Sequence, residues 1–250
     1  RDGSDDNPYT AADLAAIRAG RSAVRILAYF SIGEAENYRG YWQAFWDAND
    51  DGRPDPDAPA WLGPENPDWD GNYAVRYWDP AWQELILARL DRLVTAGYDG
   101  VYLDLVDAFE YWGPDGDQPA PRNTAARDMA DFIARLAARA RTRNAAFLIV
   151  PQNGEALGEY AEYRRLVNGI GREDVWYDGD DRQAGDETAG VLRALKRFQD
   201  DGKFVLTIDY PTTAGARAAY YAAAGAAGML ALAPPRALDR CVTRAGDDGA

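Results

Sequence analysis

The sequence predicts an α/β fold whose strands run parallel, either as an open sheet or as a barrel. Short apolar runs of strand length alternate with longer segments of helical periodicity along the chain. The 250 residues are 47% hydrophobic, which excludes a disordered chain and is enough for one large domain. No segment approaches the roughly 18 apolar residues that a membrane helix needs, so we expect no membrane insertion.

Helix ends carry the clearest local signals. Thr10 and Asp13 have the spacing of a capping box, so a short helix is expected to begin there and to end at Gly20. An amphipathic helix is expected over residues 82–95, with Gly97 as its C-terminal cap. Further helices are expected over residues 127–143, 158–166 and 188–201, and in a segment that ends at residue 224.

Six apolar segments have the length and composition of core strands. They are residues 24–30, 100–104, 146–150, 168–173, 204–209 and 229–233. Residues 74–78 are a weaker candidate for a seventh strand. Because a closed barrel of this type needs eight strands, we expect one or two strands to precede the sequence given.

We expect a single domain over residues 1–240, because no internal repeat and no linker divides it. Residues 47–72 form a long acidic loop, called the acidic excursion below, which is rich in Pro, Asp and Gly. It is longer than a turn that only connects two elements. Residues 241–250 are expected to be a loose C-terminal tail.

The composition excludes several kinds of chemistry. The chain has no His, which removes Ser-His-Asp and Cys-His nucleophile systems and the usual zinc sites. Its one cysteine, Cys241, cannot form a disulfide within the chain. Lys196 lies in an Arg-rich helical run and Lys203 begins a strand, so neither favours a Schiff-base enzyme.

The chain is strongly acidic, with a formal charge of -14. This charge repels polyanions, so nucleic acid is not an expected partner, and it attracts cationic partners. A halophilic or high-GC ancestry would also produce an excess of Asp over Glu and of Arg over Lys. Attraction of a cationic substrate and such an ancestry therefore both stay open as explanations of the charge.

Polar side chains gather at the carboxyl ends of five predicted strands, the face at which barrel enzymes carry their sites. They are Ser31, Glu34, Asp104, Asp107, Gln152, Asn153, Glu155, Glu173, Asp174, Asp209 and Tyr210. Aromatic residues, among them Tyr29, Tyr111 and Trp112, flank the same ends. Carboxylate pairs beside flat aromatic rings are typical of glycoside hydrolysis. The alternative for any single position is a turn, N-cap or core residue.

Five motifs stand out along the chain: residues 29–39 (YFSIGEAENYR), 61–66 (WLGPEN), 97–107 (GYDGVYLDLVD), 151–154 (PQNG) and 208–210 (IDY). Together they resemble the endo-alpha-1,4-polygalactosaminidase family of glycoside hydrolases, family 114, and more closely its bacterial and archaeal branch. The resemblance covers about residues 1–240. It implies a (β/α)8 TIM-type barrel with two strands ahead of the first one counted here, usually secreted or extracytoplasmic.

The resemblance also implies the reaction and the residues that perform it. The expected substrate is an alpha-1,4-linked galactosamine or N-acetylgalactosamine polysaccharide, cleaved internally, and no cofactor is required for the chemistry. Asp104 is implied as the nucleophile or base and Glu173 as the acid. Substrate-binding residues are expected at Tyr29, Ser31, Glu34, Asp107, Tyr111, Trp112, Gln152, Asn153, Asp209 and Tyr210.

One departure from the family pattern concerns the substrate. Better-studied members carry Asp-Pro-Asp-Asn after the fourth strand and Glu-Glu-Cys after the sixth, where this chain has residues 103–107 (LDLVD) and 172–174 (RED). The alternative is a non-catalytic carbohydrate-binding barrel. A separation of roughly 5 to 9.5 Å between the carboxylates of Asp104 and Glu173 would favour the enzyme.

The acidic excursion contains the spacing of a calcium loop. Oxygen ligands occupy positions one, three, five and nine, and Gly52 supplies the sharp turn at position six. Position twelve is Ala58 in place of the usual Glu, and Asp57 or Glu65 could substitute for it. A structural Ca2+ that orders residues 47–72 is expected, and the alternative is an acidic surface loop. The expected ligands are Asp47, Asn49, Asp51 and Asp55.

Overall fold

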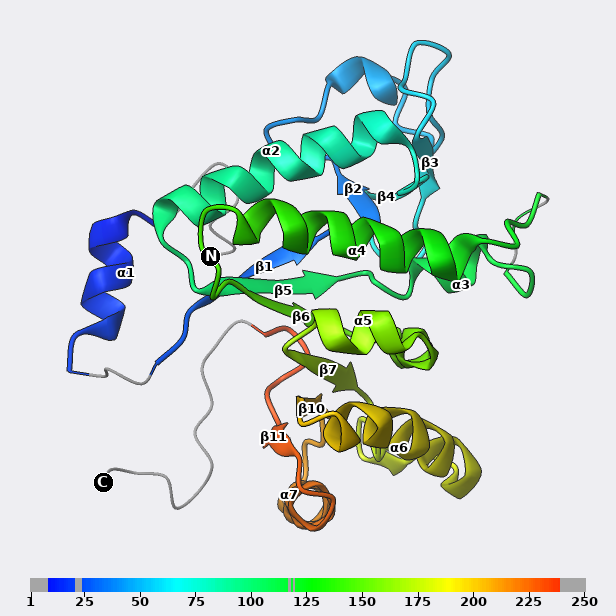
Figure 1. Cartoon of the computed structure of the whole chain (residues 1–250). Coiled ribbons are helices and arrows are strands. Elements are labelled where there is room, and N and C mark those ends of the chain that lie inside the picture. Colours follow the sequence, from blue (N-terminus) through cyan, green and yellow to red (C-terminus); the bar gives the residue numbers. More distant parts are fainter. Residues whose placement is uncertain (1–8, 21–23, 117, 119, 239–250) are drawn as a thin grey trace. The chain divides into compact units, whose positions relative to one another are not determined.

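The computed structural model describes residues 9–20, 24–116, 118 and 120–238 (Figure 1). The chain divides into two compact units, Arg1–Val150 and Pro151–Ala250. The α/β class and all six predicted core strands are confirmed. The single domain over residues 1–240 stays a prediction, and both Cys241 and the tail at residues 241–250 lie outside the described residues.

The first unit holds a sheet of three strands in the order β1 (Leu27–Ser31), β5 (Gly100–Asp104) and β6 (Leu148–Pro151). β1 and β5 are parallel, with Ser31 opposite Asp104, and the three arrows point the same way in Figure 1. Gly100 is required at the start of β5, because an added Cβ would overlap the backbone of the neighbouring strand. The pairing therefore places the carboxyl ends of β1 and β5 side by side.

Two long helices, α2 (Pro80–Ala96) and α4 (Ala125–Arg141), run alongside each other over this sheet (Figure 1). Each buries an apolar face, as expected for amphipathic helices that cover a sheet. Trp82 of α2 is fully buried, and its indole Nε1 donates a hydrogen bond to the carbonyl of Ile32 (3.0 Å). This contact anchors the segment directly after β1.

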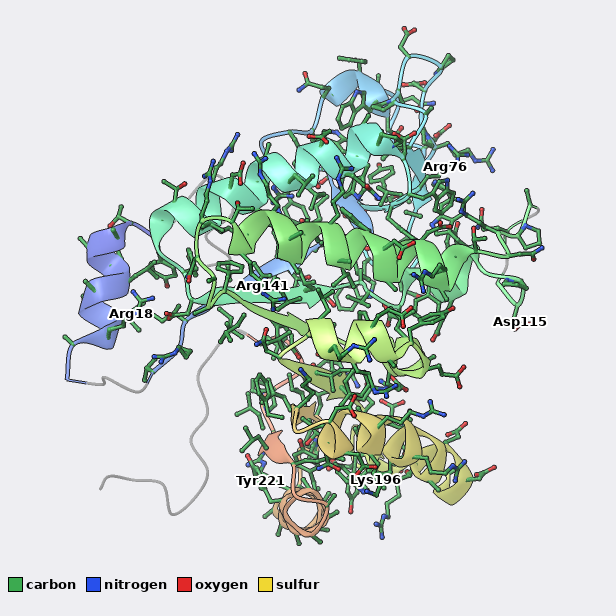
Figure 2. All side chains as sticks on the ribbon, viewed as in Figure 1. Arg18, Arg76, Asp115, Arg141, Lys196 and Tyr221 are labelled. Atoms are coloured by element: carbon green, nitrogen blue, oxygen red, sulfur yellow. The ribbon has the colours of Figure 1, made fainter. Side chains whose placement is uncertain are left out.

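The predicted helix caps are confirmed. Before α1 (Ala11–Arg18), the Thr10 hydroxyl accepts from the Asp13 N–H and the Asp13 carboxylate accepts from the Thr10 N–H, which is a capping box. Gly97 ends α2 with φ of 95°, a left-handed conformation that favours glycine. Arg18, labelled in Figure 2, donates from Nη2 to the Asp99 carboxylate (2.8 Å). That carboxylate also accepts the N–H that precedes β1, so α1 is tied to the amino ends of β1 and β5.

The structure adds an antiparallel sheet that the sequence analysis did not anticipate. Its order is β2 (Glu34–Glu36), β4 (Asn72–Val75) and β3 (Leu62–Glu65). The candidate seventh core strand at residues 74–78 is therefore wrong, because the chain there belongs to β4, which ends at Val75. β2 and β3 are short and contain Glu, Gly and Pro, so they lack an apolar strand pattern. Two short helices, η1 (Ala44–Trp46) and α3 (Ala108–Trp112), complete this unit.

The second unit is built on a parallel sheet in the order β11 (Leu230–Leu232), β10 (Phe204–Ile208) and β7 (Gly169–Glu173). Its main helices are α6 (Gly185–Asp200) and α7 (Ala214–Ala226). The helix expected over residues 158–166 is divided into η2 (Glu155–Glu159) and α5 (Ala161–Leu166), because Tyr160 is extended between them. A short hairpin, β8 (Tyr177–Asp178) with β9 (Asp181–Arg182), follows β7.

Lys196 lies on α6 in solvent, with its side chain 68% exposed and its Nζ 2.5 Å from the Asp200 carboxylate (Figure 2). This exposed ion pair agrees with the position of Lys196 in a charged, Arg-rich helical run. In the part of the chain that the structure describes, no helix combines the length and apolar character needed to cross a membrane.

Candidate active site

Asp104 ends β5 and accepts hydrogen bonds on both carboxylate oxygens. The Tyr29 hydroxyl on β1 donates to its Oδ2 (2.5 Å), and the N–H of Leu105 donates to its Oδ1 (2.8 Å). Burial raises the pKa of Tyr29, and the charge of Asp104 raises it further. The phenol therefore stays protonated and acts as a donor. Two donors of this kind stabilise a carboxylate charge and fix its orientation.

Three predicted site segments share an unusual backbone conformation. Leu105, Asn153 and Asp174 have φ angles of 56°, 58° and 51°, in the left-handed region. Each directly follows a predicted site residue at the carboxyl end of a strand. Non-glycine residues seldom adopt positive φ, and such conformations concentrate at functional sites. This backbone feature is independent of the side-chain chemistry and points to the same strand ends.

The loops after β1 and β5 meet at Gly33. An added Cβ there would overlap the carbonyl oxygen of Leu105 and the side chain of Ala108, so the close approach requires glycine. Beside this contact lies a cavity of about 390 Å³. Four of the predicted substrate-binding residues line it: Glu34, Asp107, Tyr111 and Trp112.

The cavity wall is rich in carboxylates. Besides Glu34 and Asp107, it includes Glu65, Asp68 and Glu110, to which the sequence analysis gave no substrate role. Glu65 belongs to the motif WLGPEN, which forms part of the family resemblance. That motif is the feature of the sequence that could have identified Glu65 as a site residue. Several carboxylates around one concave surface attract a cation.

Glu34 is the most buried of these acids, with 8% of its surface exposed. Its Oε1 accepts a hydrogen bond from Nδ2 of Asn66 (2.8 Å). Burial raises the pKa of Glu34; the Asn66 hydrogen bond opposes that rise, and the charge of Asp104 adds to it. Ser31, which is also buried, donates to the backbone carbonyl of Glu34 (3.3 Å). The two acids Glu34 and Asp104 therefore influence each other electrostatically.

In the second unit, Glu173 ends β7 and accepts a hydrogen bond from the Tyr210 hydroxyl at its Oε1. Burial raises the pKa of Tyr210, and the charge of Glu173 adds to the rise. The side-chain oxygen of Asn153 accepts the N–H of Glu173 (3.2 Å), which fixes the strand end. Gln152 is buried and forms a parallel bridge with Gly171 of β7.

Two arginines compensate the acidic groups of this unit. The Nε of Arg172 lies 3.1 Å from the Glu155 carboxylate. The guanidinium of Arg236 lies 4.3 Å from the centroid of the Tyr210 ring, and its Nη2 is 3.0 Å from the Asp174 carboxylate. Burial raises the pKa of Asp174, and the charge of Arg236 opposes the rise.

Asp209 is fully buried, and both of its carboxylate oxygens face backbone N–H groups. Oδ1 accepts from Val175 (2.9 Å), and Oδ2 accepts from Trp176 (2.8 Å) and Tyr177 (2.9 Å). Burial raises the pKa of Asp209, and these three hydrogen bonds oppose the rise. This geometry orders the loop after β7. The substrate-binding role of Asp209 stays a prediction, as does the catalytic pairing of Asp104 with Glu173.

The acidic loop at residues 47–55 is ordered by its own hydrogen bonds. The Asp47 carboxylate accepts from the N–H groups of Asp51 (3.1 Å) and Gly52 (3.0 Å) and from the Tyr73 hydroxyl (2.7 Å). Among the described residues, no group of three or more acidic, His or Cys side chains is arranged to hold a metal ion. The structure therefore does not support the calcium site expected at Asp47, Asn49, Asp51 and Asp55. These side chains instead satisfy the backbone and one another.

The sequence profile of glycoside-hydrolase family GH114 matches residues 4–248 of the chain. An uncharacterized protein of Methanocaldococcus jannaschii is 40% identical over 215 residues, which are 84% of this chain and 58% of that protein. The chain thus spans little more than half the length of this relative.

Two solved structures share the fold at low identity. Aspergillus fumigatus Ega3, in complex with galactosamine, has a TM-score of 0.64 at 21% identity, over 91% of this chain and 80% of that one. The glycoside hydrolase domain of PelA from Pseudomonas aeruginosa has a TM-score of 0.66 at 19% identity, over 93% of this chain and 85% of that one. Since the family profile covers nearly its whole length, the chain belongs to glycoside-hydrolase family GH114.

Proposed function

We propose that this chain is the catalytic part of an endo-acting glycosidase that hydrolyses alpha-1,4-linked galactosamine or N-acetylgalactosamine polysaccharide. Family membership supports the reaction, and the galactosamine bound by Ega3, a protein of the same fold, supports the substrate class. The observation that carries the proposal is the cavity of about 390 Å³ beside the end of β5. Its carboxylate lining complements a cationic amino sugar, and its size suits a small number of sugar rings.

We propose Asp104 and Glu173 as the catalytic carboxylates. In this reaction one carboxylic acid protonates the glycosidic oxygen, and the leaving sugar departs with that proton as an alcohol. The other carboxylate either takes a proton from the water that attacks the anomeric carbon, or attacks that carbon itself; in the second case water, deprotonated by the first group, then cleaves the glycosyl ester and releases the carboxylate. Asp104, which accepts two hydrogen bonds, suits the anionic role of nucleophile or base. Glu173 then takes the role of the acid, and both groups stand on rigid strand ends.

We further propose that the fold is a (β/α)8 TIM-type barrel. The predicted site residues lie at or just after the carboxyl ends of β1, β5, β6, β7 and β10, which is where barrel enzymes carry their sites. A crystal structure of the full-length protein would test this. A separation of roughly 5 to 9.5 Å between the Asp104 and Glu173 carboxylates supports the pairing, and a much longer one contradicts it.

We also propose a secreted or extracytoplasmic location, because a polysaccharide substrate does not cross a membrane. Fractionation of cells that express the full-length protein tests this location. A protein confined to the cytoplasm would contradict it.

The proposed activity is tested by digestion of a panel of polysaccharides with the purified chain. The panel contains deacetylated polygalactosamine, its N-acetylated form, galactosaminogalactan, and chitosan as a glucosamine control. We expect a ladder of oligosaccharides from the galactosamine polymers, which is the product pattern of internal cleavage. Binding of these polymers without any release of oligosaccharides would instead favour the non-catalytic carbohydrate-binding barrel.

A further inference from the structure

Two large aromatic side chains are exposed at or against the turn between β3 and β4, and part of this turn lines the acidic cavity. Trp69, in the turn between β3 and β4, is 62% exposed, and Tyr38, just after β2, is 55% exposed. Tryptophan is highly buried on average in folded proteins, so such exposure needs a physical reason. Exposed aromatic surface beside a concave site commonly takes part in binding.

The turn that carries Trp69 is also a wall of the cavity. Asn66 and Asp68, which precede Trp69, line the cavity, and Asn66 holds the Glu34 carboxylate through its Nδ2. Within the turn, the N–H of Trp69 donates to the carbonyl of Asn66 (3.2 Å), and the N–H of Asn72 donates to the carbonyl of Trp69 (3.1 Å). These hydrogen bonds give the backbone of Trp69 a fixed place at the rim of the cavity.

Tyr38 is held against the same turn. Its hydroxyl lies 2.8 Å from the Glu36 carboxylate and 3.2 Å from the side-chain oxygen of Asn72. The N–H of the preceding residue, Asn37, donates to the carbonyl of Gly71 (2.8 Å). An aromatic ring that is fixed before a ligand arrives loses little conformational entropy on binding.

The surroundings of Trp69 suit a cationic sugar. Trp69 is flanked in the sequence by two exposed acidic residues, Asp68 and Asp70. A flat indole offers apolar surface to the C–H groups of a sugar ring and a negative face to a cation, while the carboxylates attract an ammonium group. A neutral sugar would use only the first of these features.

We propose that Trp69 and Tyr38 form an outer subsite, which binds an amino-sugar residue of the same polysaccharide beside the cavity. The inference rests on the proposed function, because the bound chain must continue from the cavity onto the rim. It makes affinity depend on chain length, since only a longer oligosaccharide reaches both places.

The test measures dissociation constants by isothermal titration calorimetry for galactosamine, its disaccharide and a long galactosamine oligosaccharide. All titrations use the full chain with Glu173→Gln, so that the ligands survive. Trp69→Ala should weaken binding of the long oligosaccharide about 5- to 30-fold, the size of one exposed aromatic contact, and should leave galactosamine unaffected. Trp69→Phe should restore most of the lost affinity. Phe45→Ala is the matched control, because Phe45 is 53% exposed in the same unit and does not line the cavity.

The outcomes separate the inference from the proposed function. Equal affinities of the Glu173→Gln chain with and without Trp69→Ala for the long oligosaccharide would overturn the outer subsite, while hydrolysis by the wild type would still support the function. Equal losses for galactosamine and for the long oligosaccharide would also overturn it, because Trp69 would then act within the cavity. If the wild-type chain neither binds nor cleaves galactosamine polymers, the proposed function and this inference fail together.

Discussion

The Asp104 site and the Glu173 site, one in each unit, repeat a local arrangement. In both, a parallel strand ends in a carboxylate, a tyrosine hydroxyl donates to that carboxylate, and the next residue has a positive φ. The alternative for either residue taken alone was ordinary turn or N-cap chemistry, which explains neither the tyrosine partner nor the left-handed residue. The repetition favours a shared function for the two strand ends.

The two sites differ in the charges that surround them. Next to Asp104, burial raises the pKa of Glu34 and the charge of Asp104 raises it further. Near Glu173, Arg236 pairs with Asp174 and opposes the rise that burial causes in the pKa of Asp174. The interactions named here thus bring two carboxylates under each other's influence at one site and pair a carboxylate with a guanidinium at the other. Different surroundings of this kind are how enzymes give two carboxylates different roles.

The largest effect is expected from removing either proposed catalytic group. Asp104→Asn and Glu173→Gln keep the shape of the side chain but abolish proton transfer and nucleophilic attack, so turnover should fall at least about 10²- to 10⁴-fold. The measurement is kcat on a galactosamine polymer that the wild type degrades, with thermal melting as the control for folding. Near wild-type turnover in one variant would remove that residue from the mechanism, and Glu34 would become the next candidate.

Removing the tyrosine hydroxyls that donate to Asp104 and Glu173 should have a smaller effect on activity, and a different one at each site. Tyr210 is only 4% exposed over the whole residue, whereas Tyr29 is 39% exposed; although the Tyr29 hydroxyl itself is desolvated, water can reach the space left by its removal more easily. A hydrogen bond to a charged group contributes about 1.5–3 kcal/mol, so Tyr210→Phe should lower kcat/KM about 10- to 100-fold. Tyr29→Phe should lower it less than about tenfold, because solvent restores part of the interaction. A larger loss in Tyr29→Phe than in Tyr210→Phe would contradict this account.

Each unit also holds a carboxylate that orders a loop, and the two should differ in their effect on stability. Asp209 accepts from three N–H groups of buried residues, so Asp209→Ala should lower the free energy of unfolding by about 2–3 kcal/mol. Asp47 accepts from the N–H groups of Asp51 and Gly52 in an exposed loop and from one buried group, the Tyr73 hydroxyl, so Asp47→Ala should cost less, about 1–2 kcal/mol. Urea unfolding measures both, and an equal or reversed order would show that exposure does not set the cost.

The parallel strands and the main helices could be predicted because the periodicity of each segment agrees with the alternation of strands and helices along the chain. Residues 100–104 form β5 with the expected bounds, and Gly97 is the left-handed cap that the pattern indicated. The α/β order then placed Asp104 and Glu173 at strand ends without any structural information. Predictions of this kind depend on periodicity within one segment, which a single sequence contains.

The antiparallel sheet and the cavity lining depend on contacts between segments that are far apart in the sequence. Periodicity within one segment does not reveal such contacts. The β2–β4–β3 sheet joins Glu34 to residues 72–75, and its strands are too short and too polar to be recognised singly. For the same reason Asp68 and Glu110 were not predicted to line the cavity. The calcium spacing at Asp47 was misleading, because the same carboxylates satisfy the N–H groups of their own loop. Acidic residues that accept backbone hydrogen bonds and acidic residues that bind a metal ion can therefore occur at the same spacing in a sequence.

The smallest expected effect concerns Glu34 and the pH dependence of stability. Because burial raises its pKa in the folded chain, Glu34 binds a proton more tightly there than in the unfolded chain. Its contribution to stability therefore falls as the pH rises from the ordinary carboxyl value of about 4.3 through the raised folded value, and is lowest above both. Glu34→Gln removes this charge and can still accept the Asn66 hydrogen bond.

We therefore expect Glu34→Gln to melt at a higher temperature than the wild type at pH 7, with the difference vanishing as the pH falls below about 4. Thermal melting of both chains across this pH range is the measurement. Glu65→Gln is the control, because Glu65 lines the same cavity and is less buried. A variant that melts below the wild type at pH 7 would mean that the ionised Glu34 stabilises the fold through its partners. Burial and the charge of Asp104 would then not dominate the electrostatics of Glu34, and the contrast with the Glu173 site would disappear.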